Sequence, residues 1–313
     1  MCVKSGTRLS TFEPGAGRRI PRYHRQMFSY RHAFHAGNHA DVLKHAALIA
    51  MLRHLTEKDT ALTVIDTHAG AGLYRLDGDY AQTSGEATQG VQRLRTAAGS
   101  APLPDVLQDY LGVLASFNAP GSKAIYPGSP FLIQRLLRPQ DRLKLFEMHP
   151  TDAKALAGNV AQLEAGRQVA VVREDGFEGW RKFLPPPSRR GLLLCDPSYE
   201  IKSDYARAAG LVDEALKRFA TGTYAIWHPI IPRPEAHELP RRLRTLANKA
   251  GKPWLHAALT VKSGKQAVGL PASGMFVVNP PYTLKAALQA ALPVLVQHLA
   301  QDGHAAFSLD SGG

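Results

Sequence analysis

The stretch ALTVIDTHAGAG, residues 61–72, decides the fold that this sequence predicts. Its apolar run ends at Asp66, and the turn that follows contains Gly70 and Gly72. This order predicts a buried strand that leads into a tight turn, where glycine lets the backbone pass close to a ligand. Because the third glycine of the dinucleotide-binding fingerprint is missing, the turn alone fits an ordinary strand-to-helix connection equally well.

Strands and helices alternate along the rest of the chain. Apolar residues at helical spacing predict helices over residues 41–55, 131–137, 151–164, 206–219 and 235–250. Short apolar runs predict strands over residues 143–147, 169–173, 191–195, 224–227, 255–262 and 274–278. This alternation predicts an α/β fold with a parallel sheet that ends in an antiparallel hairpin, followed by one helix and a tail.

Three parts of the chain differ in composition. Residues 1–27 contain six basic residues and one acidic residue and are rich in Gly, Pro and Ser, which predicts a disordered basic extension. This extension is either an RNA-binding arm or, as we prefer, a solvated tail or a mis-assigned start, with Met27 as the true start. Residues 75–125 predict a small helical insertion in a domain formed by residues 28–74 and 126–313.

The net charge of +12 at pH 7 favours an anionic partner, and nucleic acid is the first candidate. No apolar run approaches the roughly 18 residues of a membrane span, and the N-terminus lacks the apolar core of a secretion signal. With two cysteines in the chain, no disulfide framework or thiolate zinc cluster is available. We therefore expect a cytoplasmic protein that makes no contact with a membrane.

Four predicted strands lead into an acidic residue. In a doubly wound sheet, ligands bind beyond the carboxyl ends of the strands. Glu147 is placed to accept hydrogen bonds from both ribose hydroxyls of a nucleoside, although a solvated loop carboxylate would give the same sequence. The four acids at strand ends are Asp66, Glu147, Asp175 and Asp196.

The motif Asp196-Pro197-Ser198-Tyr199 follows the predicted strand over residues 191–195. The amino group of adenine is a poor nucleophile because its lone pair is delocalised into the ring. The Asp196 carboxylate and the Pro197 carbonyl would accept hydrogen bonds from both amino hydrogens and direct the lone pair toward an electrophile. Tyr199 would stack on the base. The motif therefore predicts chemistry on the exocyclic amine of adenine.

Together these motifs resemble the class I S-adenosylmethionine-dependent methyltransferases that modify the N6 amine of adenine. Residues 28–45, FSYRHAFHAGNHADVLKH, resemble the opening of the bacterial 23S ribosomal RNA adenine-N6 methyltransferases of the RlmJ type. The resemblance continues to about residue 300 through residues 67–72, 126–130, 147–150 and 175–177. It implies a Rossmann-like fold, S-adenosylmethionine as the cofactor, and 23S ribosomal RNA, protein-free or in an early assembly intermediate, as the substrate.

The resemblance also implies roles for single residues in the cofactor site. Glu147 would hold the ribose, Asp175 and Gly176 would border the adenine of the cofactor, and Asp196 would be the catalytic acceptor. The full set implied to contact the cofactor is His45, His68, Ser129, Glu147, Asp175, Gly176 and Asp196.

For the RNA, the resemblance implies contact with Tyr30, with His32 and Lys44 as candidates nearby. The choice of 23S ribosomal RNA over transfer RNA or DNA depends entirely on this resemblance. RNA helices have a deep and narrow major groove, so recognition is expected to depend on shape, phosphates and an exposed loop.

The adenine motif departs from the tetrapeptide Asp-Pro-Pro-Tyr of the family, because Ser198 takes the third position. Both acceptors and the aromatic side chain remain, so we expect activity to remain. Residues 279–282, NPPY, match the general N6-adenine pattern better. They are followed by only one predicted helix and a tail, whereas Asp196 leaves room for the three further strands that the fold requires, so we assign the chemistry to Asp196.

Two other classes of function compete with a methyltransferase. A metal-dependent phosphodiester hydrolase would also be basic, and a non-catalytic RNA-binding module could use the basic pairs at residues 189–190 and 241–242. We expect no metal, because Ala36-Gly37-Asn38 does not hold a helix well between the first two candidate ligands and no second ligand cluster is present. The candidate metal ligands are His35, His39, Asp41 and His45.

Overall fold

The structure is a computed structural model that describes residues 32–77, 85–122, 124–264 and 269–313. The predicted basic extension, residues 1–27, and the predicted RNA contact Tyr30 lie outside the described residues. None of the described helices is both long and apolar enough to cross a membrane.

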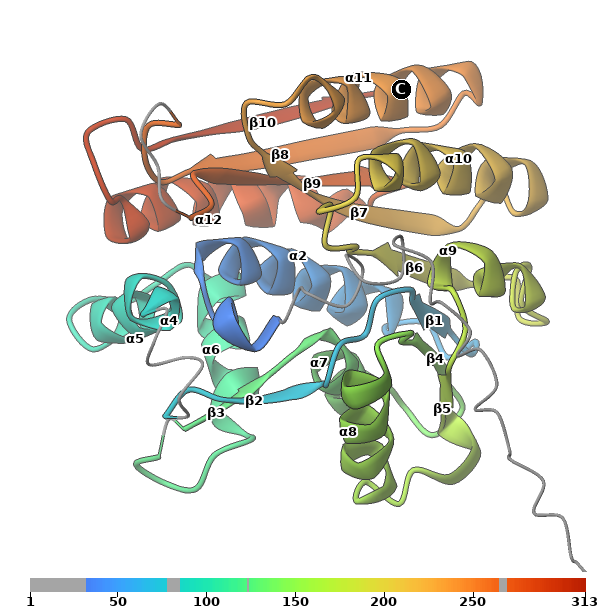
Figure 1. Cartoon of the computed structure of the whole chain (residues 1–313), viewed down its shortest axis with the longest axis horizontal. Coiled ribbons are helices and arrows are strands. Elements are labelled where there is room, and N and C mark those ends of the chain that lie inside the picture. Colours follow the sequence, from blue (N-terminus) through green and yellow to red (C-terminus); the bar gives the residue numbers. More distant parts are fainter. Residues whose placement is uncertain (1–31, 78–84, 123, 265–268) are drawn as a thin grey trace, which may run out of the picture.

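A twisted sheet runs through the centre of the described chain, with strand order β10-β8-β9-β7-β6-β1-β4-β5 (Figure 1). The strands from β5 through β4, β1 and β6 to β7 are parallel, and β9, β8 and β10 continue the sheet in antiparallel pairs. The strands are β1 (Thr63–Asp66), β4 (Arg142–Phe146), β5 (Val169–Val172), β6 (Gly191–Cys195), β7 (Thr223–Ile230), β8 (Trp254–Thr260), β9 (Ala272–Val278) and β10 (Ala306–Gly312). The predicted α/β fold with its late antiparallel hairpin is confirmed.

The edge strand β10 corrects the prediction of a tail after the last helix, and it raises the strands after Asp196 from three to four. β10 pairs antiparallel with β8 along its whole length, from Ala306 opposite Thr260 to Gly312 opposite Trp254. Most of its residues are exposed, so its sequence lacks the apolar alternation of a half-buried strand. Backbone hydrogen bonds to β8 form this strand, and such bonds leave no pattern in the side chains.

Two hydrophobic cores cover the two faces of the sheet. Successive residues of a strand point to opposite faces, so Val64 belongs to one core and Ile65 to the other. The first core includes apolar residues of α2 (His39–Leu55), α7 (Ser129–Leu136), α8 (Pro150–Ala161) and α12 (Tyr282–Leu299). The second includes those of α10 (Ser203–Arg218) and α11 (Pro234–Lys249), which lie side by side in Figure 1.

Residues 75–125 contain the short helices α4 (Glu86–Gln89) and α5 (Val91–Ala98) and the longer α6 (Asp105–Ala115). A small antiparallel sheet of β2 (Leu73–Arg75) and β3 (Ile125–Pro127) joins the two ends of this segment. Apolar side chains of α5 and α6 belong to the same core as α2. The division of the chain into a domain and a helical insertion stays a prediction.

The strand order places the acids at strand ends along one edge of the sheet. β1 lies between β4 and β6, and Asp66 is in register with Leu145 on one side and Leu194 on the other. The chain continues through β4 and β5 on one side of β1 and through β6 and β7 on the other. This is the change in strand order beyond which open α/β sheets bind their ligands.

Candidate active site

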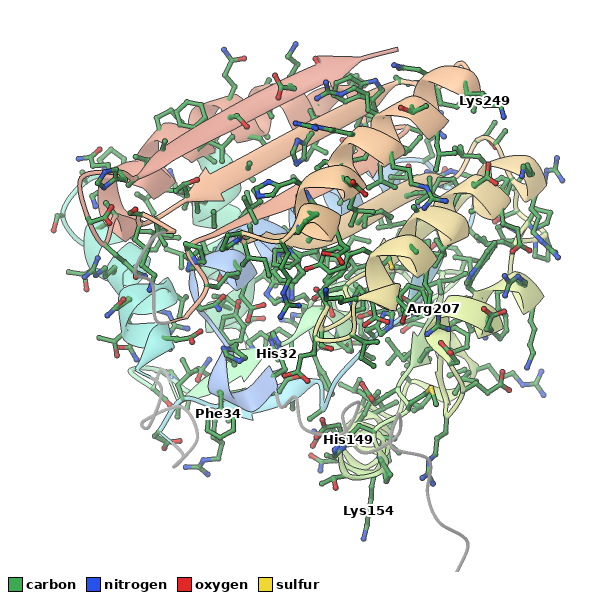
Figure 2. The ribbon with its side chains drawn as sticks, turned by 45° about the horizontal axis from the view of Figure 1, so that its top comes forward. His32, Phe34, His149, Lys154, Arg207 and Lys249 are labelled. Carbon is green, nitrogen blue, oxygen red and sulfur yellow. The ribbon has the colours of Figure 1, made fainter. Side chains whose placement is uncertain are left out.

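A cavity, which we call the first cavity, opens at the carboxyl edge of β1, β4 and β6. Figure 2 labels three of its wall residues, His32, His149 and Arg207, which come from η1 (His32–Phe34), the N-cap of α8, and α10. The wall also contains all seven residues predicted to contact a cofactor, which are His45, His68, Ser129, Glu147, Asp175, Gly176 and Asp196.

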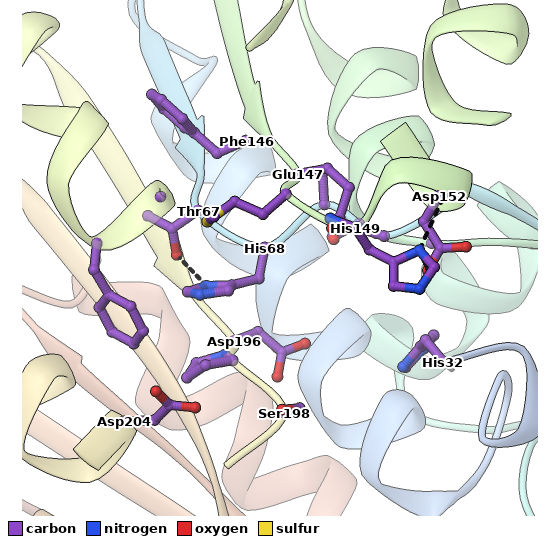
Figure 3. A pocket seen from close by; sticks show the side chains of 18 of the residues that line it. His32, Thr67, His68, Phe146, Glu147, His149, Asp152, Asp196, Ser198 and Asp204 are labelled. Atoms are coloured by element: carbon purple, nitrogen blue, oxygen red, sulfur yellow. Dashed lines mark hydrogen bonds and ion pairs between the residues drawn. The ribbon is translucent and has the colours of Figure 1, made fainter. Parts of the chain in front are cut away.

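Glu147, labelled in Figure 3, follows β4 directly, and two backbone N–H groups hold its carboxylate in place. Gly70 donates to Oε2 at 2.8 Å and His149 donates to Oε1 at 2.6 Å. Burial raises the pKa of Glu147, and these hydrogen bonds oppose the rise. Gly70 has a φ of +61°, and a Cβ there would lie 2.4 Å from the Tyr74 hydroxyl, so the turn requires glycine.

His45 and Ser129 supply polar groups from α2 and α7. His45 Nδ1 lies 2.8 Å from the Tyr126 hydroxyl, and its buried Nε2 has no hydrogen-bond partner among the described residues. Burial lowers the pKa of His45 to about 3, so the ring is neutral. Ser129 Oγ donates to Asp66 Oδ2 at 2.6 Å, and burial raises the pKa of Asp66 to about 6.

Asp175 and Gly176 form the opposite end of the first cavity, at the start of α9 (Gly176–Gly179). Asp175 caps this turn by accepting from the Phe177 N–H, and its other oxygen lies 2.5 Å from Arg207. The Arg207 guanidinium lies 4.2 Å from the centre of the Phe177 ring, and the His68 ring contacts the same ring edge-to-face. Both Asp175 oxygens are therefore engaged by the protein.

Asp204, in the first turn of α10, is a wall residue that sequence reasoning missed. It is 7% exposed, and its carboxylate accepts no hydrogen bond from the described residues. Burial raises its pKa to about 6, against the influence of Arg207. Figure 3 shows it on the side of Asp196 opposite to Glu147 and His149. Sequence alone offered no signal for it, because an acid in the first turn of a helix is usually a solvated group that favours the helix dipole.

Asp196 follows β6 directly and forms a buried ion pair that the sequence did not predict. Lys44 Nζ lies 2.5 Å from Asp196 Oδ2 and 2.8 Å from Asp41 Oδ1. Burial alone would lower the pKa of Lys44, but the charges of Asp196 and Asp41 outweigh it and raise that pKa. His32 Nε2 lies 3.1 Å from the other oxygen of Asp41. Lys44 therefore fixes Asp196 and is itself fixed by Asp41.

A second cavity adjoins the first on the other side of Asp196. Its wall includes Tyr199 and Trp227. The Tyr199 ring is 2% exposed, and its hydroxyl donates to the Trp227 carbonyl at 2.8 Å. A base could therefore reach Tyr199 only from this cavity, and stacking stays a prediction. The second cavity shares with the first the residues His32, Lys44, Asp196 and Ser198.

The histidines proposed as metal ligands have other neighbours. His35 contacts Glu86 at 3.0 Å, His45 contacts Tyr126, and Asp41 pairs with Lys44. In residues 32–77, 85–122, 124–264 and 269–313, no three or more His, Cys, Asp or Glu side chains group in a way that could hold a metal ion.

The two candidate RNA-contacting pairs and the NPPY motif lie elsewhere. Arg190 precedes β6, and its guanidinium donates to the backbone carbonyls of Leu55 and Thr60, which is a structural role. Asn279 follows β9, whose antiparallel direction puts Val278 opposite Tyr224, near the start of β7. Asn279 thus lies at the edge of the sheet opposite to Asp196, where its amide donates to the carbonyls of Ala220 and Gly222.

Comparison with known proteins gives concordant results. Residues 59–309 match the model of a family described as ribosomal RNA large subunit methyltransferase D, RlmJ. The chain is 41% identical over 284 residues to ribosomal RNA large subunit methyltransferase J of Escherichia coli, covering 90% of this chain and 98% of that protein. It is 38% identical over 285 residues to the protein of the same name from Haemophilus influenzae, covering 91% and 98%. A crystal structure of a Legionella pneumophila protein is similar, with a TM-score of 0.80, 31% identity and coverage of 89% and 99%.

Proposed function

Because this chain belongs to the RlmJ family of ribosomal RNA large subunit methyltransferases, we propose that it transfers a methyl group from S-adenosylmethionine to the N6 amine of an adenine in 23S ribosomal RNA. One observation carries this proposal: two cavities meet at Asp196, which follows β6 directly. A reaction between a cofactor and a base needs two adjoining sites with a polar group where they meet. The first and second cavities meet that requirement.

The wall of the first cavity fits the cofactor. Glu147, held by two backbone N–H groups, keeps lone pairs for the ribose hydroxyls. The partnerless Nε2 of His45 is available to a polar group of the ligand. Asp204 is an acceptor for the amino group of the cofactor's adenine, because Asp175 is already engaged. S-adenosylmethionine, when bound, supplies an electrophilic methyl group.

The residues around Asp196 then act on the target adenine. The Asp196 carboxylate and the Pro197 carbonyl accept hydrogen bonds from the two amino hydrogens and hold the nitrogen lone pair toward the first cavity. Lys44 occupies Oδ2 of Asp196, so Oδ1 is the oxygen that accepts the amino hydrogen and takes up the proton released. A flipped base occupies the second cavity, where Tyr199 forms part of the wall.

The test is to incubate the protein with S-adenosylmethionine and, separately, protein-free 23S ribosomal RNA, bulk transfer RNA and DNA. N6-methyladenosine is then measured by mass spectrometry after digestion. We expect methylation of the ribosomal RNA alone, in keeping with a cytoplasmic site of action. Methylation of transfer RNA or DNA instead would keep the chemistry and contradict the substrate. Activity that a chelator abolishes would favour the metal-dependent alternative.

Asp204→Asn is expected to weaken cofactor binding by about 10- to 100-fold, because hydrogen bonds to charged groups contribute about 1.5–3 kcal/mol. Isothermal titration with S-adenosylhomocysteine measures the change. Asp213→Asn is the matched control, since Asp213 is partly exposed on the same helix and pairs with Lys217. The analogue in which inosine replaces adenosine should bind wild type and Asp204→Asn with similar affinity. An unchanged dissociation constant for Asp204→Asn would remove Asp204 from the adenine site.

A further inference from the structure

A third cavity lies beside the second, near the N-terminus of α2. Its wall residues come from the start of α2, from both ends of α4, from the described residues Lys262, Gly269 and Leu270, and from the segment that follows α12. Most of the side chains are polar, and none of them takes part in the chemistry described above. The wall residues that matter here are Asn38, His39, Gln89, Lys262, Leu270 and Gln301.

The second and third cavities adjoin, because Asn38 and Leu270 line both of them. The Asn38 side chain caps α2 by accepting from the N–H groups of Ala40 and Asp41, and it donates to Glu86. The wall between the two cavities is therefore held rigidly. An RNA strand whose base enters the second cavity can place its next nucleotide in the third cavity.

His39 is the feature of the third cavity that points to a ligand. The side chain is 4% exposed, and its buried Nε2 has no hydrogen-bond partner among the described residues. A buried polar atom without a partner destabilises the folded protein, so such atoms commonly have a functional explanation. Burial lowers the pKa of His39 to about 4, and the neutral ring can accept or donate one hydrogen bond at this atom.

The surrounding groups favour a nucleotide as the occupant. Gln89 and Gln301 carry amides, which pair with the donor and acceptor edges of bases. Lys262 places a positive charge near enough to lower the pKa of His39, where it can also attract a phosphate. Glu86 lies in the same wall, but His35 and Asn38 engage its carboxylate.

We propose that the third cavity binds the nucleotide next to the target adenine and that His39 and Gln301 recognise its base. This inference rests on the proposed function, since it assumes an RNA strand with a flipped adenine in the second cavity. Sequence-specific proteins recognise single-stranded RNA by hydrogen bonds to the edges of unstacked bases. The third cavity would thus select the sequence around the adenine, whereas Asp196 and Pro197 act on the adenine itself.

The experiment uses a 23S ribosomal RNA fragment that wild-type protein methylates, and two copies of it in which the nucleotide before or after the target adenine is abasic. kcat/KM is measured for wild type, His39→Ala and Gln301→Ala. His304→Ala is the control, because His304 is exposed and lies outside the cavity. Gln301 lies partly exposed after α12, so Gln301→Ala tests the cavity even if His39→Ala destabilises α2.

We expect one abasic substitution to lower kcat/KM of wild type by about tenfold or more, and each cavity variant to do the same on intact RNA. Combining the variant with that abasic RNA should cause little further loss, because both changes remove one interaction. Affinity for S-adenosylhomocysteine should not change. Fully additive losses, or no loss with either abasic RNA, would overturn this inference alone. If wild type methylated no fragment of 23S ribosomal RNA, the proposed function and, with it, the RNA occupant would be overturned.

Discussion

Asp196→Asn is expected to lower kcat for adenine methylation by about 10²- to 10⁴-fold, the range that one positioned acid–base or hydrogen-bonding group contributes. The amide keeps the size of the side chain, but its uncharged oxygen is a weaker acceptor for the amino hydrogen and cannot take up the proton. Lys44 keeps Asp41 as a partner in this variant, so the buried ammonium is not left alone. Cofactor affinity should fall much less than kcat.

The natural control for Asp196→Asn is Tyr282→Ala, in the NPPY motif. Tyr282 is 83% exposed at the start of α12, so its loss should leave both activity and stability unchanged. Single-turnover methylation separates the chemical step from product release, and a melting curve shows whether each variant is folded. Near-wild-type turnover by a folded Asp196→Asn protein would disprove the assignment, and a large loss with Tyr282→Ala would redirect attention to residues 279–282.

Acidification below pH 6.5 is expected to unfold the protein cooperatively, with a midpoint between about pH 4 and 6. Four buried histidines and one half-buried histidine, His68, have pKa values lowered to about 3 or 4, mainly by loss of contact with water. In the unfolded chain each would have a pKa of about 6.5. These residues are His39, His45, His68, His228 and His256.

Proton uptake determines whether the free energy of unfolding rises or falls as the pH falls. Above about pH 7.5 the histidines are neutral in both states and do not affect stability. As the pH falls from 6.5 toward 4, the unfolded chain binds protons that the folded chain refuses, and each histidine costs up to about 1.4 kcal/mol per pH unit. Asp66 and Asp204 act oppositely, because their pKa values are raised to about 6 in the folded state. The five histidines outnumber these two carboxyls, so the free energy of unfolding falls as the pH falls.

The pair His228 and His256 offers a test of this account. Their Nε2 atoms lie 3.0 Å apart, so one nitrogen must donate and the other accept, and a second proton would break the contact. Urea unfolding at a series of pH values measures how the free energy of unfolding depends on pH. His256→Gln should reduce the slope between about pH 4.5 and 6.5, whereas exposed His304→Gln should leave it unchanged. A stability that does not change over this interval would contradict the buried neutral histidines.

The parallel part of the sheet was predictable because its strands are buried on both faces and read as short apolar runs. The run before Asp196, residues 191–195, matches β6 residue for residue. The prediction of a class I S-adenosylmethionine-dependent methyltransferase fold is confirmed by the family and by the strand order. β10 was missed because backbone pairing alone forms this exposed strand.

The candidate site was predictable where an acidic residue directly follows a predicted strand, as at Glu147 and Asp196. The Lys44–Asp196 pair was not, because it joins residues 152 positions apart in the chain and no local pattern encodes such a contact. Asp204 was missed because an acid in the first turn of a helix is usually solvated, whereas this one is buried. Tyr199 was expected to present its ring to a base, but the ring packs against Tyr205 and only its contact with the second cavity remains.

The four residues shared by the first and second cavities have a thermodynamic consequence. A ligand in either cavity would lie against the Lys44–Asp196 pair, which lines both cavities. We therefore expect the two binding equilibria to be linked. Linkage is reciprocal, so the factor by which cofactor would tighten RNA binding must equal the factor by which RNA would tighten cofactor binding. Any cooperativity between cofactor binding and RNA binding would thus arise from the residues that line both cavities.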